Sequence, residues 1–277
     1  MLPILEKYNK VLKIRGRAKS TLKMYNYTLI NFLDNIDEDF TTIEVDIIRD
    51  YISKEQEKNK RTTVNTKIAI IKSFFKWLRE EGIRDNNPTI NLKKSKVIDN
   101  QRRYLKPEEI EIIRLKDFSL LNKLIFEVLL TSGIRVSEAR NLDWNDINFP
   151  RRSLLVQKGK GGKSRVTKFS IRAKLLLIKY RELREDDDKW VFQSDFKKRM
   201  SVKSLQRRVS KIGEKTKIGI NLTPHRLRHT FATMLSKNST PIEVIQELLG
   251  HENLNTTKRY IHVSQDSVDF HFNQVFS

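Results

Sequence analysis

The sequence contains no cysteine among its 277 residues. Disulfide bonds and zinc sites with cysteine ligands are therefore excluded. The sequence also lacks any apolar run close to the roughly 18 consecutive residues of a membrane-spanning helix, and it shows no signal-peptide core. We therefore expect a cytoplasmic protein that has no contact with a membrane.

Acidic residues are scarce relative to basic ones. The chain holds 55 lysines and arginines against 34 aspartates and glutamates, which gives a net charge of +21. This balance favours a polyanionic partner, and nucleic acid is the leading candidate. A metal-dependent nuclease would need clustered carboxylates, and we interpret the acidic run Asp186–Asp188 as a loop. The composition therefore favours a nucleic-acid partner, and nothing in it calls for a bound metal or a cofactor.

Strand-like alternation is missing from the first 88 residues. Apolar residues recur there at helical spacing and predict helices over about residues 4–12, 21–33, 43–57 and 62–81. The segment Asn86-Asn87-Pro88 then interrupts the pattern. We predict a helical domain over residues 1–88. A basic linker over residues 89–104 follows, which either lies along DNA phosphates or is a plain solvated tether.

Residues 105–277 have a mixed pattern. The almost wholly apolar run Leu120–Leu130 is predicted to lie in the core, and helices are predicted over about residues 171–184 and 202–215. Leu154–Val156 and Arg165–Phe169 are predicted as strands on either side of a glycine-rich turn. The fold class expected for the chain is mainly α with a small antiparallel β-sheet, in which an α+β domain over residues 105–277 follows the helical one.

The stretch from Thr223 to Tyr260 holds the residues most suited to chemistry. Thr223 and Pro224 form a helix start, which places His225 and Arg228 on one face of the new helix. A second helix follows from about residue 241, with Gly250 as its stop and His251 directly after it. A third short helix from about residue 255 is expected to carry Tyr260.

In this order and spacing, these residues closely resemble the tyrosine recombinase family. The likeness rests on His225-x-x-Arg228, on Gly250-His251, on Tyr260 nine positions after His251, and on Arg135 within the upstream segment TSGIRVSE. The glycine-rich turn contains GKGGK, which resembles the GKGxK of the family. That match selects Lys160 over its rivals Lys158 and Lys163.

The resemblance implies one catalytic role for each matched residue. Arg135 and Arg228 hold the non-bridging oxygens of a DNA phosphate, because a planar guanidinium suits bidentate contacts with an anion. Tyr260 is the nucleophile. Its phenol has an ordinary pKa of ~10, so it needs a neighbouring base or hydrogen bond. His225 is the candidate for that base or for an orienting group.

The other implied roles concern the leaving group and the phosphate. Lys160 donates a proton to the leaving 5′-oxygen, and His251 hydrogen-bonds the scissile phosphate. His229, four residues after His225, is interpreted as structural, because a zinc-binding helix of the metalloprotease type needs glutamate where Arg226 stands. Glu138, three residues after Arg135, is expected to orient an arginine or to cap its helix.

The resemblance also implies an architecture. A core-binding domain and a catalytic domain form a C-shaped clamp around double-stranded DNA, and four protomers exchange strands through a Holliday junction and a 3′-phosphotyrosyl intermediate, without metal or ATP. The residues expected to contact DNA are Arg15, Arg17, Lys19, Asn65, Thr66, Lys67, Lys163 and Arg165. The C-terminal segment, about residues 264–277, alternates apolar and polar residues and is expected to dock on a neighbouring protomer.

Within the family, the chain looks most like the Xer subgroup, which resolves chromosome dimers at dif-type sites during chromosome partition in the cell cycle. Within this subgroup, the archaeal type that acts as a single kind of protein is one of the alternatives left open. A phage or transposon integrase and a type IB topoisomerase-like enzyme share the same catalytic residues and remain alternatives. A catalytically idle, sequence-specific DNA-binding protein would explain the charge but not the six matched residues.

Overall fold

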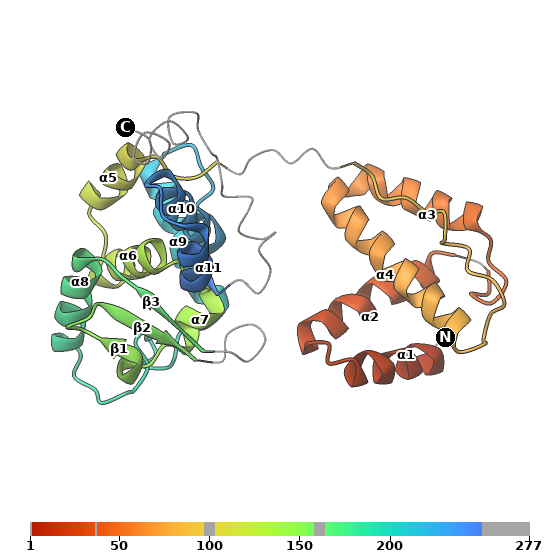
Figure 1. The fold of residues 1–277 in the computed structure, drawn as a ribbon, viewed down its shortest axis with the longest axis horizontal. Coiled ribbons are helices and arrows are strands. Elements are labelled where there is room, and N and C mark those ends of the chain that lie inside the picture. The colour runs from red at the N-terminus through yellow and green to blue at the C-terminus, as the bar shows by residue number, and fades with distance from the viewer. Residues whose placement is uncertain (1, 37, 97–102, 158–163, 251–277) are drawn as a thin grey trace, which may run out of the picture. The chain divides into compact units, whose positions relative to one another are not determined.

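The computed structural model describes residues 2–36, 38–96, 103–157 and 164–250. The chain divides into two compact units, Met1–Asn100 and Gln101–Ser277. The described residues are mainly helical, and they also form one three-stranded antiparallel sheet (Figure 1). The predicted fold class, mainly α with a small antiparallel sheet, is therefore confirmed. No helix in these ranges is long and apolar enough to cross a membrane.

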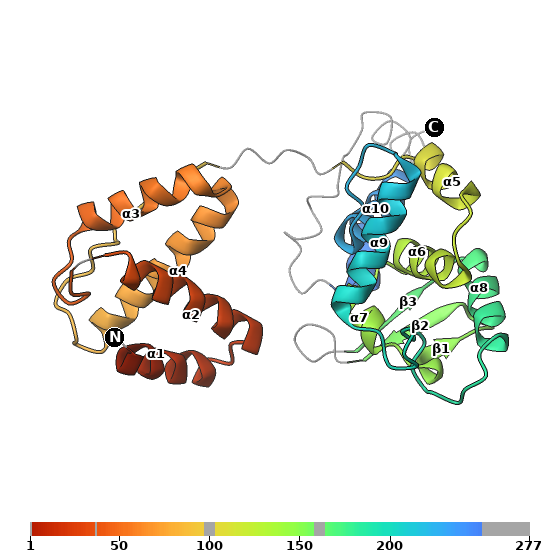
Figure 2. The same cartoon turned by 180° about the vertical axis from the view of Figure 1, so that it is seen from behind.

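The first unit is built around its last helix. Its elements are α1 (Leu2–Ile14), α2 (Lys19–Asp34), α3 (Val45–Lys58) and α4 (Arg61–Glu80). Helix α4 contacts both α2 and α3, while α1 packs on α2 (Figure 2). The core includes the buried rings of Tyr8, Phe74 and Trp77. Burial raises the pKa of Tyr8 to about 12, and its hydroxyl donates a hydrogen bond to Ser73.

The first residues of the predicted linker belong to this unit. Leu92 joins the apolar core, and Lys72 Nζ donates a hydrogen bond to its carbonyl oxygen at 2.8 Å. The side-chain amide of Asn65 pairs with the backbone N–H and carbonyl of Ser95. Leu92 and Ser95 thus anchor this segment to the helical unit, while its lysines stay exposed. One leucine between polar residues gave too weak a pattern to show this from the sequence.

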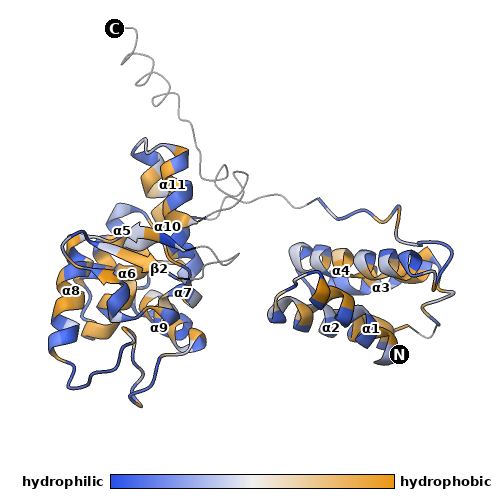
Figure 3. Cartoon of the chain, turned by 60° about the horizontal axis from the view of Figure 1, so that its bottom comes forward, coloured by the Kyte–Doolittle hydropathy of each residue, from blue (hydrophilic) through white to orange (hydrophobic). Residues whose placement is uncertain are grey.

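The second unit is centred on α6. Its elements, in chain order, are α5 (Pro107–Leu115), α6 (Leu120–Ser132), α7 (Val136–Asn141), the 3₁₀ helix η1 (Trp144–Asp146), β1 (Ile147–Asn148), β2 (Ser153–Val156), β3 (Arg165–Lys168), α8 (Ile171–Glu182), α9 (Val202–Thr216), α10 (Pro224–Lys237) and α11 (Ile242–Leu249). Helix α6 is buried along most of its length and contacts α8, α9, α10 and β3. Figure 3 shows apolar residues gathered on α6 and β2. The core of this unit therefore surrounds α6, as its apolar run predicted.

The sheet fixes the strands on either side of the glycine-rich segment. Its strand order is β1-β2-β3, and all the pairs are antiparallel. Val156 at the end of β2 pairs with Arg165 at the start of β3. Strands β2 and β3 match the predicted strands, whereas the two-residue β1 was too short to give a sequence pattern. The glycine-rich segment itself, residues 158–163, lies outside the described residues, and this backbone pair flanks it.

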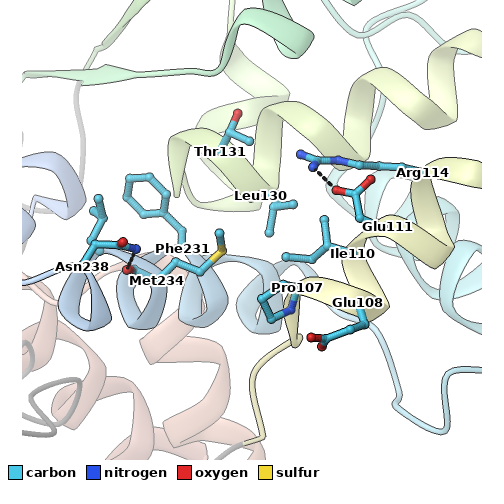
Figure 4. A pocket seen from close by; sticks show the side chains of 11 residues that line it. Pro107, Glu108, Ile110, Glu111, Arg114, Leu130, Thr131, Phe231, Met234 and Asn238 are labelled. Atoms are coloured by element: carbon cyan, nitrogen blue, oxygen red, sulfur yellow. Dashed lines mark hydrogen bonds and ion pairs between the residues drawn. The ribbon is translucent and has the colours of Figure 1, made fainter. Parts of the chain in front are cut away.

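A cavity of about 520 Å³ lies between α5, α6 and α10 (Figure 4). Its wall is mainly apolar and includes Leu130, Phe231 and Met234, while Glu108 and Glu111 stand on the α5 side. Arg135, His225 and Arg228, the predicted catalytic residues within the described ranges, are not among the residues that line it.

Gly133 ends α6 in a place where no side chain fits. Its φ is +63°, and a Cβ there would lie 2.3 Å from Cδ1 of Phe231. We expect Gly133→Ala to lower the free energy of unfolding by about 2–5 kcal/mol, through left-handed backbone strain and overpacking. Gly219→Ala is the matched control, because its φ is +67° with open space around it. That variant should lose only about 1–2 kcal/mol in chemical denaturation of the full chain. Equal losses would contradict the packing argument.

Candidate active site

Arg135 stands at the junction between α6 and α7. Gly133 stops α6 in a left-handed conformation, and Arg135 then takes the N-cap position of α7. Glu138 accepts hydrogen bonds from the Arg135 backbone N–H and from its Nη1, each at 2.7 Å. The Arg135 side chain keeps 28% of its surface exposed. Glu138 thus both caps the helix and orients the arginine, and the guanidinium stays accessible to a ligand.

Arg228 lies on the buried face of α10. Thr223 caps this helix, because its hydroxyl oxygen accepts from the Arg226 backbone N–H at 3.1 Å. One turn later the Arg228 guanidinium is buried, and it donates to the carbonyl oxygens of Gly133 at 2.6 Å and Leu249 at 2.7 Å. A buried charge is tolerated where hydrogen bonds compensate for the lost hydration. These contacts fix the position of the guanidinium between the ends of α6 and α11.

The end of α11 brings the two arginines together. Arg135 Nη2 lies 3.4 Å from the Gly250 carbonyl oxygen, and Arg228 donates to the carbonyl oxygen of the preceding Leu249. Gly250 has a φ of +63°, which ends α11 as the sequence predicted. Arg135 and Arg228 are 93 positions apart in the sequence but share this short segment. Their clustering creates a positive site suited to an anionic group.

Arg165 is enclosed beside Glu138, a position that the sequence did not predict. It was expected to contact DNA, but its side chain is only 9% exposed. Its Nη1 and Nη2 donate to the two carboxylate oxygens of Glu138 at 2.9 and 2.7 Å, and its Nε donates to the Leu248 carbonyl oxygen at 3.0 Å. The spacing of Glu138 from Arg135 indicated that this carboxylate orients an arginine. It gave no sign that a second arginine, 27 residues later, shares it.

The Glu138 carboxylate is held in its ionised form. Burial raises its pKa, but the hydrogen bonds from the Arg165 side chain and the Arg135 backbone outweigh burial and lower the pKa to about 2. The cluster of Arg135, Arg165, Arg228 and Glu138 therefore carries a net charge of +2 at neutral pH. This excess positive charge suits a phosphodiester and disfavours a metal cation. In the described ranges, no three His, Asp or Glu side chains converge on a metal-binding arrangement.

The other predicted catalytic residues are placed as follows. His225 is exposed on the first turn of α10, and His229, predicted to be structural, is half-buried one turn later. Lys160, with its neighbours Lys158 and Lys163, lies outside the described residues, and so do His251 and Tyr260. Two described residues lie close to them in the chain. Arg165 is the first residue of β3, shortly after Lys163, and Gly250 directly precedes His251. The roles of these residues stay predictions.

The predicted DNA contacts of the first unit differ in their surroundings. Arg17 and Lys19 are exposed, and the half-exposed Arg15 pairs with Glu80 at 3.2 Å. On α4, Asn65 is bound to Ser95, as described above, and the Thr66 hydroxyl donates to the Thr62 carbonyl oxygen. Lys67 forms a largely buried ion pair with Glu55. Asn65 and Lys67 therefore make contacts within the unit, which DNA would have to share or replace.

Comparisons with known proteins all give integrases and tyrosine recombinases. The profile of the "Phage integrase family" matches residues 103–267, and that of the "Phage integrase, N-terminal SAM-like domain" matches residues 5–82. The tyrosine recombinase XerA of Pyrococcus horikoshii is 34% identical over 94% of this chain and 89% of its own length. The tyrosine recombinase XerC of Oceanobacillus iheyensis is 32% identical over 76% of this chain and 73% of its own length.

Solved structures share the fold. The lambda integrase dimer bound to a COC′ core site has a TM-score of 0.80 at 20% identity, over 94% of both chains. The Tn1549 transposon integrase in complex with transposon right end DNA has a TM-score of 0.81 at 18% identity, over 99% of both chains. A crystal structure of XerA recombinase has a TM-score of 0.55 at 25% identity, over 98% of this chain and 97% of the other.

Proposed function

Because this chain belongs to the phage integrase family of tyrosine recombinases, we propose that it cleaves and rejoins double-stranded DNA through a 3′-phosphotyrosyl intermediate. The observation that carries the proposal is the meeting of Arg135 and Arg228 at the end of α11. Two guanidiniums held in fixed positions stabilise the charge that develops on a phosphate under attack. The segment that leads to His251 and Tyr260 continues directly from this point.

The proposed reaction exchanges one phosphate ester for another. The Tyr260 oxygen attacks the scissile phosphorus, and its proton passes to a base for which His225 is the candidate. A bond forms between phosphorus and the tyrosine oxygen, while the bond to the 5′-oxygen breaks. That oxygen takes a proton from Lys160 and leaves as a 5′-hydroxyl. The new ester conserves the bond energy, so a 5′-hydroxyl from another strand can reverse the step without ATP.

We further propose an Xer-type role in the cytoplasm, with four copies on two DNA duplexes resolving chromosome dimers at a dif-like site. The similarity to XerA over almost the full length of both chains supports this role. In such an assembly, residues 264–277 dock on the neighbouring protomer. The helical domain over residues 1–88, the linker to residue 104 and the catalytic domain over residues 105–277 supply the DNA-binding surfaces.

Covalent capture on genomic DNA tests this function. The full chain is incubated with sheared genomic DNA from its host in EDTA, denatured with SDS, and the protein-linked ends are sequenced. We expect protein on 3′ ends and hydroxyls on 5′ ends, concentrated at one chromosomal site. Adducts at the ends of mobile elements would instead support an integrase. DNA binding without any adduct would identify a catalytically idle DNA-binding protein, and adducts that need a divalent metal would contradict the mechanism.

A further inference from the structure

Consecutive carbonyl groups at the end of α11 each accept from a different arginine. Arg165 donates to Leu248 at 3.0 Å, Arg228 to Leu249 at 2.7 Å, and Arg135 approaches Gly250 at 3.4 Å. These arginines come from β3, from α10 and from the start of α7. The last carbonyls of a helix lack partners within the helix and carry its negative dipole end, so they attract cations. The contacts join four parts of the fold at one point.

Arg165 has a different environment from Arg135. The Arg135 side chain is 28% exposed, whereas that of Arg165 is 9% exposed and spends both of its terminal nitrogens on Glu138. A Cβ at Gly250 would lie 2.6 Å from Cδ of Arg165, so the glycine lets the side chain pass close to the backbone. Both terminal nitrogens of Arg165 are held by a carboxylate, whereas the buried Arg228 donates to neutral carbonyl oxygens. Arg165 therefore braces its neighbours.

Glu138 links Arg165 to the site. The carboxylate oxygen that accepts from Arg135 Nη1 also accepts from Arg165 Nη1. Without Arg165, Glu138 would be left to pair with Arg135 alone, and the pair would carry no net charge. Arg135 would then be drawn towards the carboxylate, and the end of α11 would lose a donor.

We propose that Arg165 is a positioning residue for strand cleavage, which holds Glu138, and through it Arg135, against the end of α11. The proposal rests on the function proposed above. Arg165 is also the first residue of β3, so the same side chain ties the start of this strand to the end of α11. A planar guanidinium suits this task, because one fork reaches both the carboxylate and a carbonyl.

The test separates binding from chemistry. The probe is a nicked duplex that carries the site recovered by covalent capture, and the full chain is used throughout. For each variant, the dissociation constant is measured by gel shift, and the rate of adduct formation is measured at saturating protein. We expect Arg165→Met to slow adduct formation by ~10²-fold, as a misplacement of about 1 Å does, while the dissociation constant stays within about threefold. Arg165→Lys should be intermediate, because it keeps the charge but not the fork.

Arg184→Met is the matched control. The Arg184 side chain is 6% exposed, chelates the Asp186 carboxylate and donates to the Trp190 carbonyl oxygen at 2.6 Å, and none of these partners belongs to the site. This variant should lower the melting temperature as Arg165→Met does, yet cleave at the unsubstituted rate.

The outcomes distinguish the two proposals. If the unsubstituted chain forms no adduct, the proposed function is wrong and this inference falls with it. If the unsubstituted chain reacts but Arg165→Met reacts equally fast, or if Arg184→Met slows as much, the positioning role alone is contradicted. If Arg165→Lys cleaved as fast as the unsubstituted chain, the charge of Arg165 would matter and the geometry of its guanidinium would not. That result would also contradict the positioning role, and it does not depend on whether Arg165→Met folds.

Discussion

Replacing Tyr260 with phenylalanine should abolish the covalent adduct while leaving DNA binding intact. Phenylalanine keeps the ring but lacks the oxygen that forms the bond to phosphorus. Removal of a catalytic nucleophile costs on the order of 10⁶-fold in rate, which places the variant below detection in an adduct assay. Binding depends on many phosphate contacts and should change little. The measurement is adduct formation on the nicked duplex, followed on a denaturing gel, beside a gel shift for binding.

Tyr104→Phe serves as the control for this loss. Tyr104 belongs to the same unit, and its ring lies 4.9 Å from the Lys237 ammonium, a contact that phenylalanine keeps. The control should form the adduct at the unsubstituted rate. If Tyr260→Phe cleaved as fast as its control, another residue would be the nucleophile.

Replacing Arg228 with alanine should damage both catalysis and stability. The loss of one positioned donor to a developing oxyanion costs ~10²- to 10³-fold in rate. The same change leaves the carbonyl oxygens of Gly133 and Leu249 without their guanidinium donor. An unsatisfied buried polar group costs about 1–3 kcal/mol, so we expect the free energy of unfolding to fall by about 2–4 kcal/mol. Single-turnover cleavage below the melting temperature and chemical denaturation measure the two effects separately.

Two further variants identify the cause of that loss. Arg228→Lys keeps the charge, but one ammonium group is a poor substitute for a fork that spans two carbonyl oxygens, so its rate should also fall by at least ~10²-fold. Arg207→Ala removes one exposed arginine from α9 and controls for net charge. It should retain the unsubstituted rate and stability. If Arg228→Ala cleaved as fast as Arg207→Ala, Arg228 would have no catalytic role.

The sequence predicted the elements because their signals are local. Helical spacing of apolar residues marked α4, and an almost wholly apolar run marked α6. The Thr223 cap and the Gly250 stop follow from the chemistry of helix ends. These features depend on residues a few positions apart. The fold class could therefore be predicted before any tertiary contact was known.

The missed features depend on contacts between distant residues. The Arg165–Glu138 pair spans 27 positions, and no periodicity connects a strand residue with a helix cap. The docking of Leu92 on the first unit is a single apolar contact in a polar segment. Likewise, the meeting of Arg135 and Arg228 is made through the carbonyls of Gly133, Leu249 and Gly250, which carry no side-chain signal.

The identity of the residue that carries DNA in the trapped complex is the most direct measurement of the proposed chemistry. After nuclease and trypsin digestion, mass spectrometry should find a nucleotide phosphate on the peptide that begins at Tyr260, linked through its 3′-oxygen to the tyrosine. A nucleotide on any other peptide, or a bond through the 5′-oxygen, would contradict the assignment of Tyr260 and the mechanism built on it.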